Sequence, residues 1–143
     1  MLVKVLIAAV FALCVFTGCG GGTAGVPEPS PTPIAVCTAL VPLIPGNLIS
    51  PAAGATGVST AVGSVSFSVA DARLLAGSLT LSPSPTAGGA PVLGGAISGT
   101  AADATASVPT LSGRTTYSVA VSANFPGDPC THTSLLGTFT TGQ

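Results

Sequence analysis

The sequence predicts an all-β domain, a sandwich of about seven short strands, which follows a signal peptide and a flexible tether. Three observations predict this fold class. Apolar and polar residues alternate with a period of two in several segments, glycine, proline and serine separate these segments, and a helical period is hard to find. Residues 37–143 are long enough to form one domain with a single core.

We interpret residues 1–18 as an export signal. Lys4 supplies a positive charge, an apolar run follows at 5–16, and Thr17 and Gly18 are small residues that suit cleavage. This run is about twelve residues long, whereas a helix that spans a membrane needs about 20. A removable signal is therefore a better interpretation than a permanent transmembrane anchor.

The stretch "FTGC", Phe16 to Cys19, resembles the lipobox of bacterial lipoproteins: an aliphatic residue, two small residues and then cysteine. The resemblance implies that Cys19 becomes the N-terminus and is diacylated on its sulfur, often with a third chain such as palmitate on its amine. Two or three acyl chains hold a protein stably at a membrane. Gly20 implies outer-membrane delivery, by resemblance to enterobacterial sorting. Phe16 replaces the usual leucine, and the alternative is a plain signal that leaves Cys19 as a free thiol.

The four cysteines have different predicted fates. Cys14 leaves with the signal and Cys19 carries the lipid, so Cys37 and Cys130 remain. An exported, oxidising compartment favours a disulfide between these two. On the chain-entropy model, a loop of about 100 residues is worth about 4.7 kcal/mol. A metal site is the weaker alternative because CxxC spacing is absent, and we predict no metal and no cofactor.

Residues 19–36 form the predicted tether between the acylated cysteine and the domain. Proline, glycine, serine and threonine dominate "GGGTAGVPEPSPTP" at 20–33, as in extended, solvated spacers. At about 3.1 Å per residue, such a chain would hold the domain a few nanometres from a membrane. The membrane, reached through the N-terminal lipid, is therefore the first partner that we expect.

In chain order, we expect strands at 47–50, 64–69, 78–82, 91–95, 105–108, 116–123 and 137–141. The clearest is 64–69, where Phe67 and two valines would face the core and serines would face outward. In 116–123, Tyr117 and two valines share one face. The other five alternate over shorter lengths. Residues 70–77 could form one helical turn, which is too short to change the fold class.

Three segments together resemble fibronectin type III and bacterial immunoglobulin-like domains. "LSGRTTYSVAV" at 111–121 resembles the tyrosine corner, with Leu111 before a glycine turn and Tyr117 opening a strand. "SPAAGATGV" at 50–58 resembles the opening of such domains, and "GTFTTG" at 137–142 resembles their last strand. The resemblance implies an immunoglobulin-like β-sandwich in which the tyrosine hydroxyl bonds backbone near the preceding turn. Tryptophan is absent and the cysteines do not match the antibody bridge, so we expect a variant sandwich.

Charge is nearly absent from the domain. Its strong bases are Arg73 and Arg114, and its acids are Asp71, Asp103 and Asp128. Phosphate backbones are bound by clustered Lys and Arg, so we predict no nucleic-acid partner. The three carboxylates are too scattered for a calcium loop. For Arg114, a solvated turn position is a simpler interpretation than recognition of an anion.

His132 is the only histidine, and "DPCTHTS" at 128–134 places Asp128 near it. A catalytic triad also needs a nucleophile held against the imidazole, and no GxSxG elbow is present. We therefore interpret His132 as an exposed loop residue. The glycine-rich stretch 88–99 lacks both phosphate-binding motifs, and close carboxylate pairs for glycoside hydrolysis are absent. We predict no catalytic residue.

These observations favour a non-enzymatic lipoprotein of the cell envelope, exported and lipid-anchored, in a structural, adhesion or interaction role. The alternative is a secreted or periplasmic binding module for a glycan, a peptide or an envelope protein. It would use the loop from Phe125 to His132 or an open sheet edge. An exposed Phe125 would favour this alternative, and a buried Phe125 would weaken it. An enzyme that uses His132 is the third hypothesis.

Overall fold

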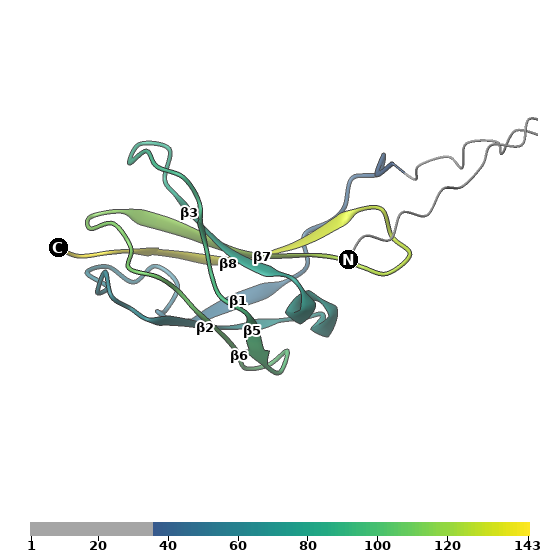
Figure 1. Cartoon of the computed structure of the whole chain (residues 1–143), viewed down its shortest axis with the longest axis horizontal. Coiled ribbons are helices and arrows are strands. Elements are labelled where there is room, and N and C mark those ends of the chain that lie inside the picture. Colours follow the sequence, from purple (N-terminus) through teal and green to yellow (C-terminus); the bar gives the residue numbers. More distant parts are fainter. Residues whose placement is uncertain (1–35) are drawn as a thin grey trace, which may run out of the picture. The chain divides into compact units, whose positions relative to one another are not determined.

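The computed structural model describes residues 36–143. The predicted signal peptide, the lipid site at Cys19 and the tether up to residue 35 lie outside the described residues. Within 36–143, two antiparallel sheets of four strands each pack face to face (Figure 1). The predicted all-β sandwich is therefore confirmed.

The first sheet has the order β1-β2-β6-β5, and the second has the order β4-β3-β7-β8. The strands of the first sheet are β1 (Gly46–Ser50), β2 (Ser64–Val69), β6 (Ala104–Ser107) and β5 (Ile97–Gly99). Those of the second are β4 (Val92–Leu93), β3 (Ser78–Pro83), β7 (Thr116–Asn124) and β8 (Thr131–Thr140). A short 3-10 helix, η1 (Ala72–Ala76), connects β2 to β3.

This strand order is that of an immunoglobulin-like sandwich. If β1, β2 and β3 are strands A, B and C, and β5 to β8 are D to G, the sheets read A-B-E-D and C-F-G. β4 extends the second sheet beyond strand C. The order follows from the chain path, in which β2 and β3 lie in different sheets and β7 returns beside β3.

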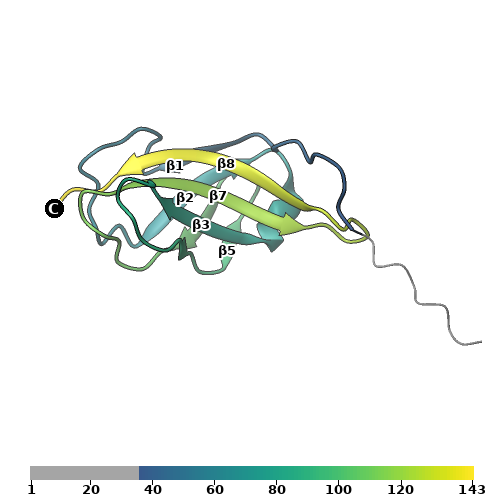
Figure 2. The same ribbon diagram turned by 90° about the horizontal axis from the view of Figure 1, so that it is seen from above.

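The core lies between the inward faces of the two sheets. Seen from above, β3, β7 and β8 lie over β1 and β2 (Figure 2). Val65, Phe67 and Val69 of β2 alternate with half-exposed or exposed serines, as the sequence predicts. β7 shows the same pattern over its nine residues, with Tyr117, Val119, Val121 and Ala123 buried. The period of two in each sequence segment therefore matches the face that each strand buries.

All seven expected segments contain strand residues, but the chain holds more strand than the sequence predicts. β5 is additional, and β8 begins at Thr131 instead of residue 137. The first half of β8 was missed because its inward position is taken by Ser134, which is fully buried. The segment 70–77 contains η1, whose first turn Asp71 caps through a bond from the Arg73 backbone N–H.

Side-chain oxygens hold the turn between β6 and β7. The Tyr117 hydroxyl accepts a hydrogen bond from the Ser112 backbone N–H at 3.0 Å, and Leu111 is buried beside it. The Thr141 hydroxyl donates to the Ser112 carbonyl at 2.6 Å and accepts from the Thr115 N–H at 3.0 Å. The first contact is the one that the tyrosine-corner resemblance implies, whereas nothing in the sequence pattern indicates Thr141.

The segment 51–58 covers the outer edge of β8. The Gly54 N–H donates to the Thr138 carbonyl at 2.6 Å, and the Val58 N–H donates to the Thr140 carbonyl at 3.1 Å. Val58 also bridges Thr141 in the parallel direction. Covering an edge in this way leaves fewer free backbone groups for another strand to pair with. An interaction through this edge is correspondingly disfavoured.

We expect Tyr117→Phe to lower the free energy of unfolding by about 1 kcal/mol, because it removes one acceptor and leaves the Ser112 N–H without its partner. Urea unfolding measures the change. Ser112→Ala is the control, since the backbone N–H remains and the side chain is exposed. If Tyr117→Phe is as stable as the parent protein, the hydroxyl contact contributes nothing to stability.

Two buried hydroxyls of the last strand region should give opposite results. Ser134 Oγ is fully buried without a hydrogen-bond partner among the described residues, in close contact with Gly46. Ser134→Ala should therefore raise the free energy of unfolding by about 1 kcal/mol, because it removes an unpaired buried group. Thr141→Val should lower it by about 1 to 3 kcal/mol, because two hydrogen bonds are lost. Changes of equal sign in the two variants would contradict this assignment.

Candidate functional site

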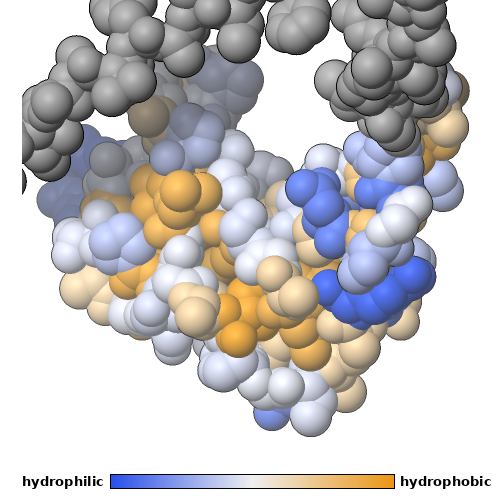
Figure 3. Space-filling model, turned by 45° about the vertical axis from the view of Figure 1, so that its right-hand side comes forward, coloured by the Kyte–Doolittle hydropathy of each residue, from blue (hydrophilic) through white to orange (hydrophobic). Residues whose placement is uncertain are grey.

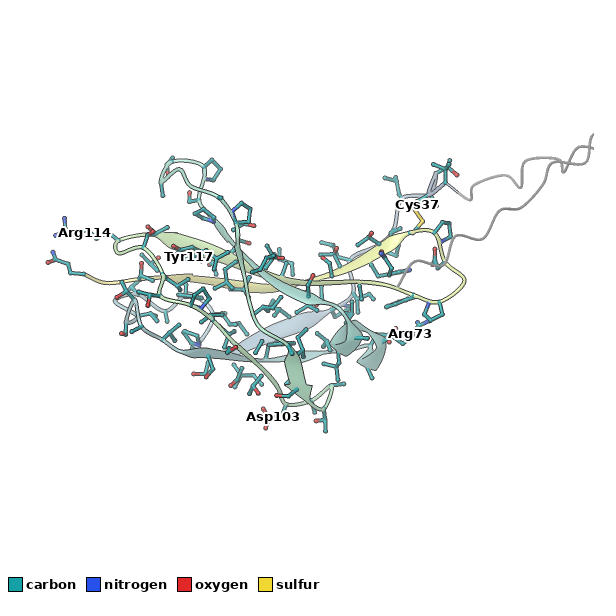
Figure 4. All side chains as sticks on the ribbon, in the orientation of Figure 1. Cys37, Arg73, Asp103, Arg114 and Tyr117 are labelled. Carbon is teal, nitrogen blue, oxygen red and sulfur yellow. A yellow bond between two sulfur atoms is a disulfide. The ribbon has the colours of Figure 1, made fainter. Side chains whose placement is uncertain are left out.

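One disulfide joins Cys37 to Cys130, as the sequence predicts. The two residues are 93 positions apart, and their Cα atoms lie 4.9 Å apart. Cys37 precedes β1, whereas Cys130 ends the loop between β7 and β8 (Figure 4). The bridge therefore closes nearly the whole domain at one end, which we call the Cys37 end. It does not cross between the sheets as in antibody domains.

An aromatic stack lies beside the disulfide. The rings of Phe125 and His132 are parallel within 9°, with centroids 4.0 Å apart. The guanidinium carbon of Arg73 lies 4.1 Å from the Phe125 centroid. Two groups this close to one ring fit only on its opposite faces, so Phe125 is enclosed between a cation and an imidazole. Such contacts stabilise a ring that is 5% exposed.

Asp128 ties this stack to the disulfide. Its carboxylate accepts hydrogen bonds from the Cys130 backbone N–H at 2.9 Å and from Nε2 of His132 at 2.8 Å. Its own N–H donates to the Phe125 carbonyl at 3.0 Å and closes a turn. The bond from Cys130, followed by that from His132, holds the pKa of Asp128 below its usual value.

Asp71 and Arg73 form an ion pair at the same end. The carboxylate of Asp71 accepts bonds from the Arg73 guanidinium, the shortest at 2.7 Å, and from its backbone N–H at 2.9 Å. The side-chain bonds to Arg73 lower the pKa of Asp71, and the same bonds raise that of Arg73. Arg73 is therefore held by Asp71 while it covers the Phe125 ring.

The interpretation of His132 as an exposed loop residue was wrong. It is the second residue of β8, and its side chain is only 17% exposed. In residues 36–143, the hydrogen bond of its ring is to Asp128, and no hydroxyl or thiol bonds to the imidazole. A histidine that activates a nucleophile must contact it. Through its bond to Asp128 and its stacking on Phe125, His132 instead holds the loop from Phe125 to Cys130 in place.

The other charged residues lie apart from this cluster. Asp103 lies in the turn between β5 and β6, and Arg114 lies at the end of the domain opposite Cys37 (Figure 4). Arg114 adopts a left-handed conformation, with φ of 53°, in the turn before Tyr117. Of the three carboxylates considered for calcium, Asp103 lies apart from the two at the Cys37 end, each of which bonds a basic side chain. Within 36–143, no three His, Cys, Asp or Glu residues are grouped as metal ligands.

The glycine-rich stretch connects the two sheets. The Gly94 N–H donates to the Leu79 carbonyl of β3 at 2.9 Å, and the Gly95 N–H donates to the Ser107 carbonyl of β6 at 2.7 Å. A Cβ on Gly95 would collide with the Ser107 hydroxyl. These glycines are therefore needed where the chain crosses closely between β4 and β5.

Two shallow, open depressions lie on the outer surface of the second sheet. The first is lined by Ala76, Gly77, Ser78, Ser122, Ala123, Asn124 and Thr131, and the second by Ser82, Pro83, Ser84, Pro85, Thr116, Ser118 and Thr138. Their polar side chains are neutral, almost all of them hydroxyls. The first depression suits a neutral polar ligand better than an ion, whereas the second exposes mainly apolar surface. From the side of the Cys37 end, strongly hydrophilic patches are few, and pale or apolar residues cover most of the visible domain surface (Figure 3).

Comparisons with known protein families, curated proteins and solved structures gave no match to this chain. Within residues 36–143, no helix is long and apolar enough to cross a membrane.

The stability of the Cys37 end should depend on pH through Asp128. Its folded pKa is below the unfolded value of about 3.9, so its contribution is present above that value and is lost as pH falls through the folded pKa. We expect Asp128→Asn to be less stable than the parent protein at neutral pH and equally stable in strong acid. Thermal unfolding from about pH 7 to about pH 2 measures this difference. A difference that stays constant with pH would contradict the assignment.

Proposed function

We propose that this protein is a non-enzymatic lipoprotein of the cell envelope. In this proposal Cys19 carries the acyl chains, residues 20–36 are the spacer, and the sandwich acts in a structural, adhesion or interaction role. Exported, anchored to the membrane, and by resemblance sorted to the outer membrane, the domain would meet other envelope components. A domain closed by a disulfide suits an oxidising compartment outside the cytosol.

The Cys37–Cys130 disulfide is the observation that carries this proposal. Disulfides persist in oxidising compartments and are rare in a reducing cytosol. The disulfide uses both cysteines of the domain, and Cys14 lies within the predicted signal, so Cys19 is left over. Because Cys19 follows "FTG" as in a lipobox, we assign it as the acylation site. Export and acylation therefore account for all four cysteines of the sequence.

A binding module for a glycan, a peptide or an envelope protein is the second candidate. One form of this hypothesis places the ligand on the loop from Phe125 to His132. The burial of Phe125 weakens it, because the Phe125 ring is not exposed to a ligand. The cover over β8 weakens the version that uses this sheet edge. The first depression on the second sheet, whose polar side chains are all uncharged, favours a neutral ligand such as a glycan.

The intact mass of the mature protein from a bacterial host tests the proposal. We expect residues 19–143 plus acyl chains, with two thiols that react with an alkylating reagent only after reduction. Cys19→Ser is the matched control, which should lose the acyl mass and leave the membrane fraction. An unacylated chain with a reactive Cys19 thiol would contradict the lipid anchor.

A further inference from the structure

The segment that enters the sandwich is apolar and exposed. Residues 36–45, "VCTALVPLIP", contain no charged residue, and we call this segment the arm. Val36 is 70% exposed, Leu40 is 101% exposed and Leu43 is 64% exposed. Among residues 36–143, these are three of the six large hydrophobic residues that are exposed. Exposed apolar residues gathered in this way mark a contact surface more often than scattered ones do.

The domain holds the arm at two points. Cys37 is bonded to Cys130, and the Ile44 N–H donates to the Thr133 carbonyl of β8 at 2.9 Å. Ile44 packs against the core, whereas Leu40 and Leu43 between these points do not. The apolar side chains are thus presented on a fixed segment and are not used by the fold.

The ends of the arm indicate what covers it. Residues 20–35 separate Cys19 from Val36, and at about 3.1 Å per residue a polyproline-like chain of this length spans about 50 Å. An acyl anchor on Cys19 would keep the arm within that distance of a bilayer and make a second contact effectively intramolecular. Of the charged groups at this end, Asp71 forms an ion pair with Arg73 and Asp128 is hydrogen-bonded to His132, so neither carboxylate is left without a partner.

We infer that the arm is a bilayer-contacting surface, in which Val36, Leu40 and Leu43 enter the boundary between headgroups and acyl chains. This inference rests on the proposed lipid anchor. Lipid chains and a peripheral apolar segment act together, each adding to membrane residence. The contact would turn the Cys37 end of the domain toward the membrane and leave the Arg114 end facing away.

Tryptophan reporters test this contact cleanly because the chain contains no tryptophan. Leu40→Trp places the reporter in the arm. Leu93→Trp is the matched control, since Leu93 is 67% exposed on β4, at the edge of the second sheet farthest from β8. Each acylated full-length variant is placed in phosphatidylethanolamine and phosphatidylglycerol vesicles, with and without brominated acyl chains. Val36→Trp provides a second arm reporter if Leu40→Trp does not fold.

We expect the fluorescence of Leu40→Trp to shift to shorter wavelength and to be quenched by at least about twofold by the brominated lipid, as for an indole at the acyl boundary. Leu93→Trp should show neither effect. The acyl mass of each sample separates the two proposals. An acylated Leu40→Trp protein that is not quenched overturns the arm contact and leaves the anchor intact, whereas an unacylated protein overturns both. A blue shift that grows with protein concentration without vesicles would assign the arm to a second copy, which also overturns the bilayer contact.

Discussion

The covalent bond between Cys37 and Cys130 is the constraint on which the structure of the Cys37 end depends. It fixes the arm before β1 to the loop before β8 and so brings together chain segments 93 positions apart. The same loop carries Asp128, which bonds the Cys130 N–H and His132, and Phe125, which His132 and Arg73 enclose. The disulfide, the bonds of Asp128 and Arg73 and the aromatic stack therefore form one connected structure.

Different kinds of interaction stabilise the two ends of the sandwich. At the Cys37 end, a covalent bond, an ion pair, a histidine–carboxylate hydrogen bond and ring stacking close the structure, and four of the domain's charged or titratable side chains are used there. At the Arg114 end, the hydroxyls of Tyr117 and Thr141 satisfy the backbone of one turn. This division would suit the proposed tethered domain, because the end at which the described chain begins is the one reinforced covalently.

Much of the fold could be predicted from alternation, since β2 and β7 bury one face each and their inward residues are apolar. β5 is too short to give a periodic signal, and the first half of β8 hides its signal because Ser134 takes an inward position. The disulfide followed from counting cysteines. The stack did not, because Arg73 lies far from Phe125 in sequence and only the fold brings η1 beside the β7–β8 loop. β7 and β8 form an antiparallel hairpin in which Ala123 lies opposite His132. Recognising this hairpin in the sequence would have placed His132 near Phe125.

Amide hydrogen exchange of the oxidised and the reduced protein tests the central role of the disulfide most directly. If the disulfide holds the Cys37 end, reduction should first speed exchange at the hydrogen-bonded amides of Ile44, Asp128 and Cys130. The amides of Ser112 and Thr115 at the Arg114 end should remain protected. Unchanged exchange in the arm and the loop after reduction, or equal loss of protection at both ends, would contradict this account.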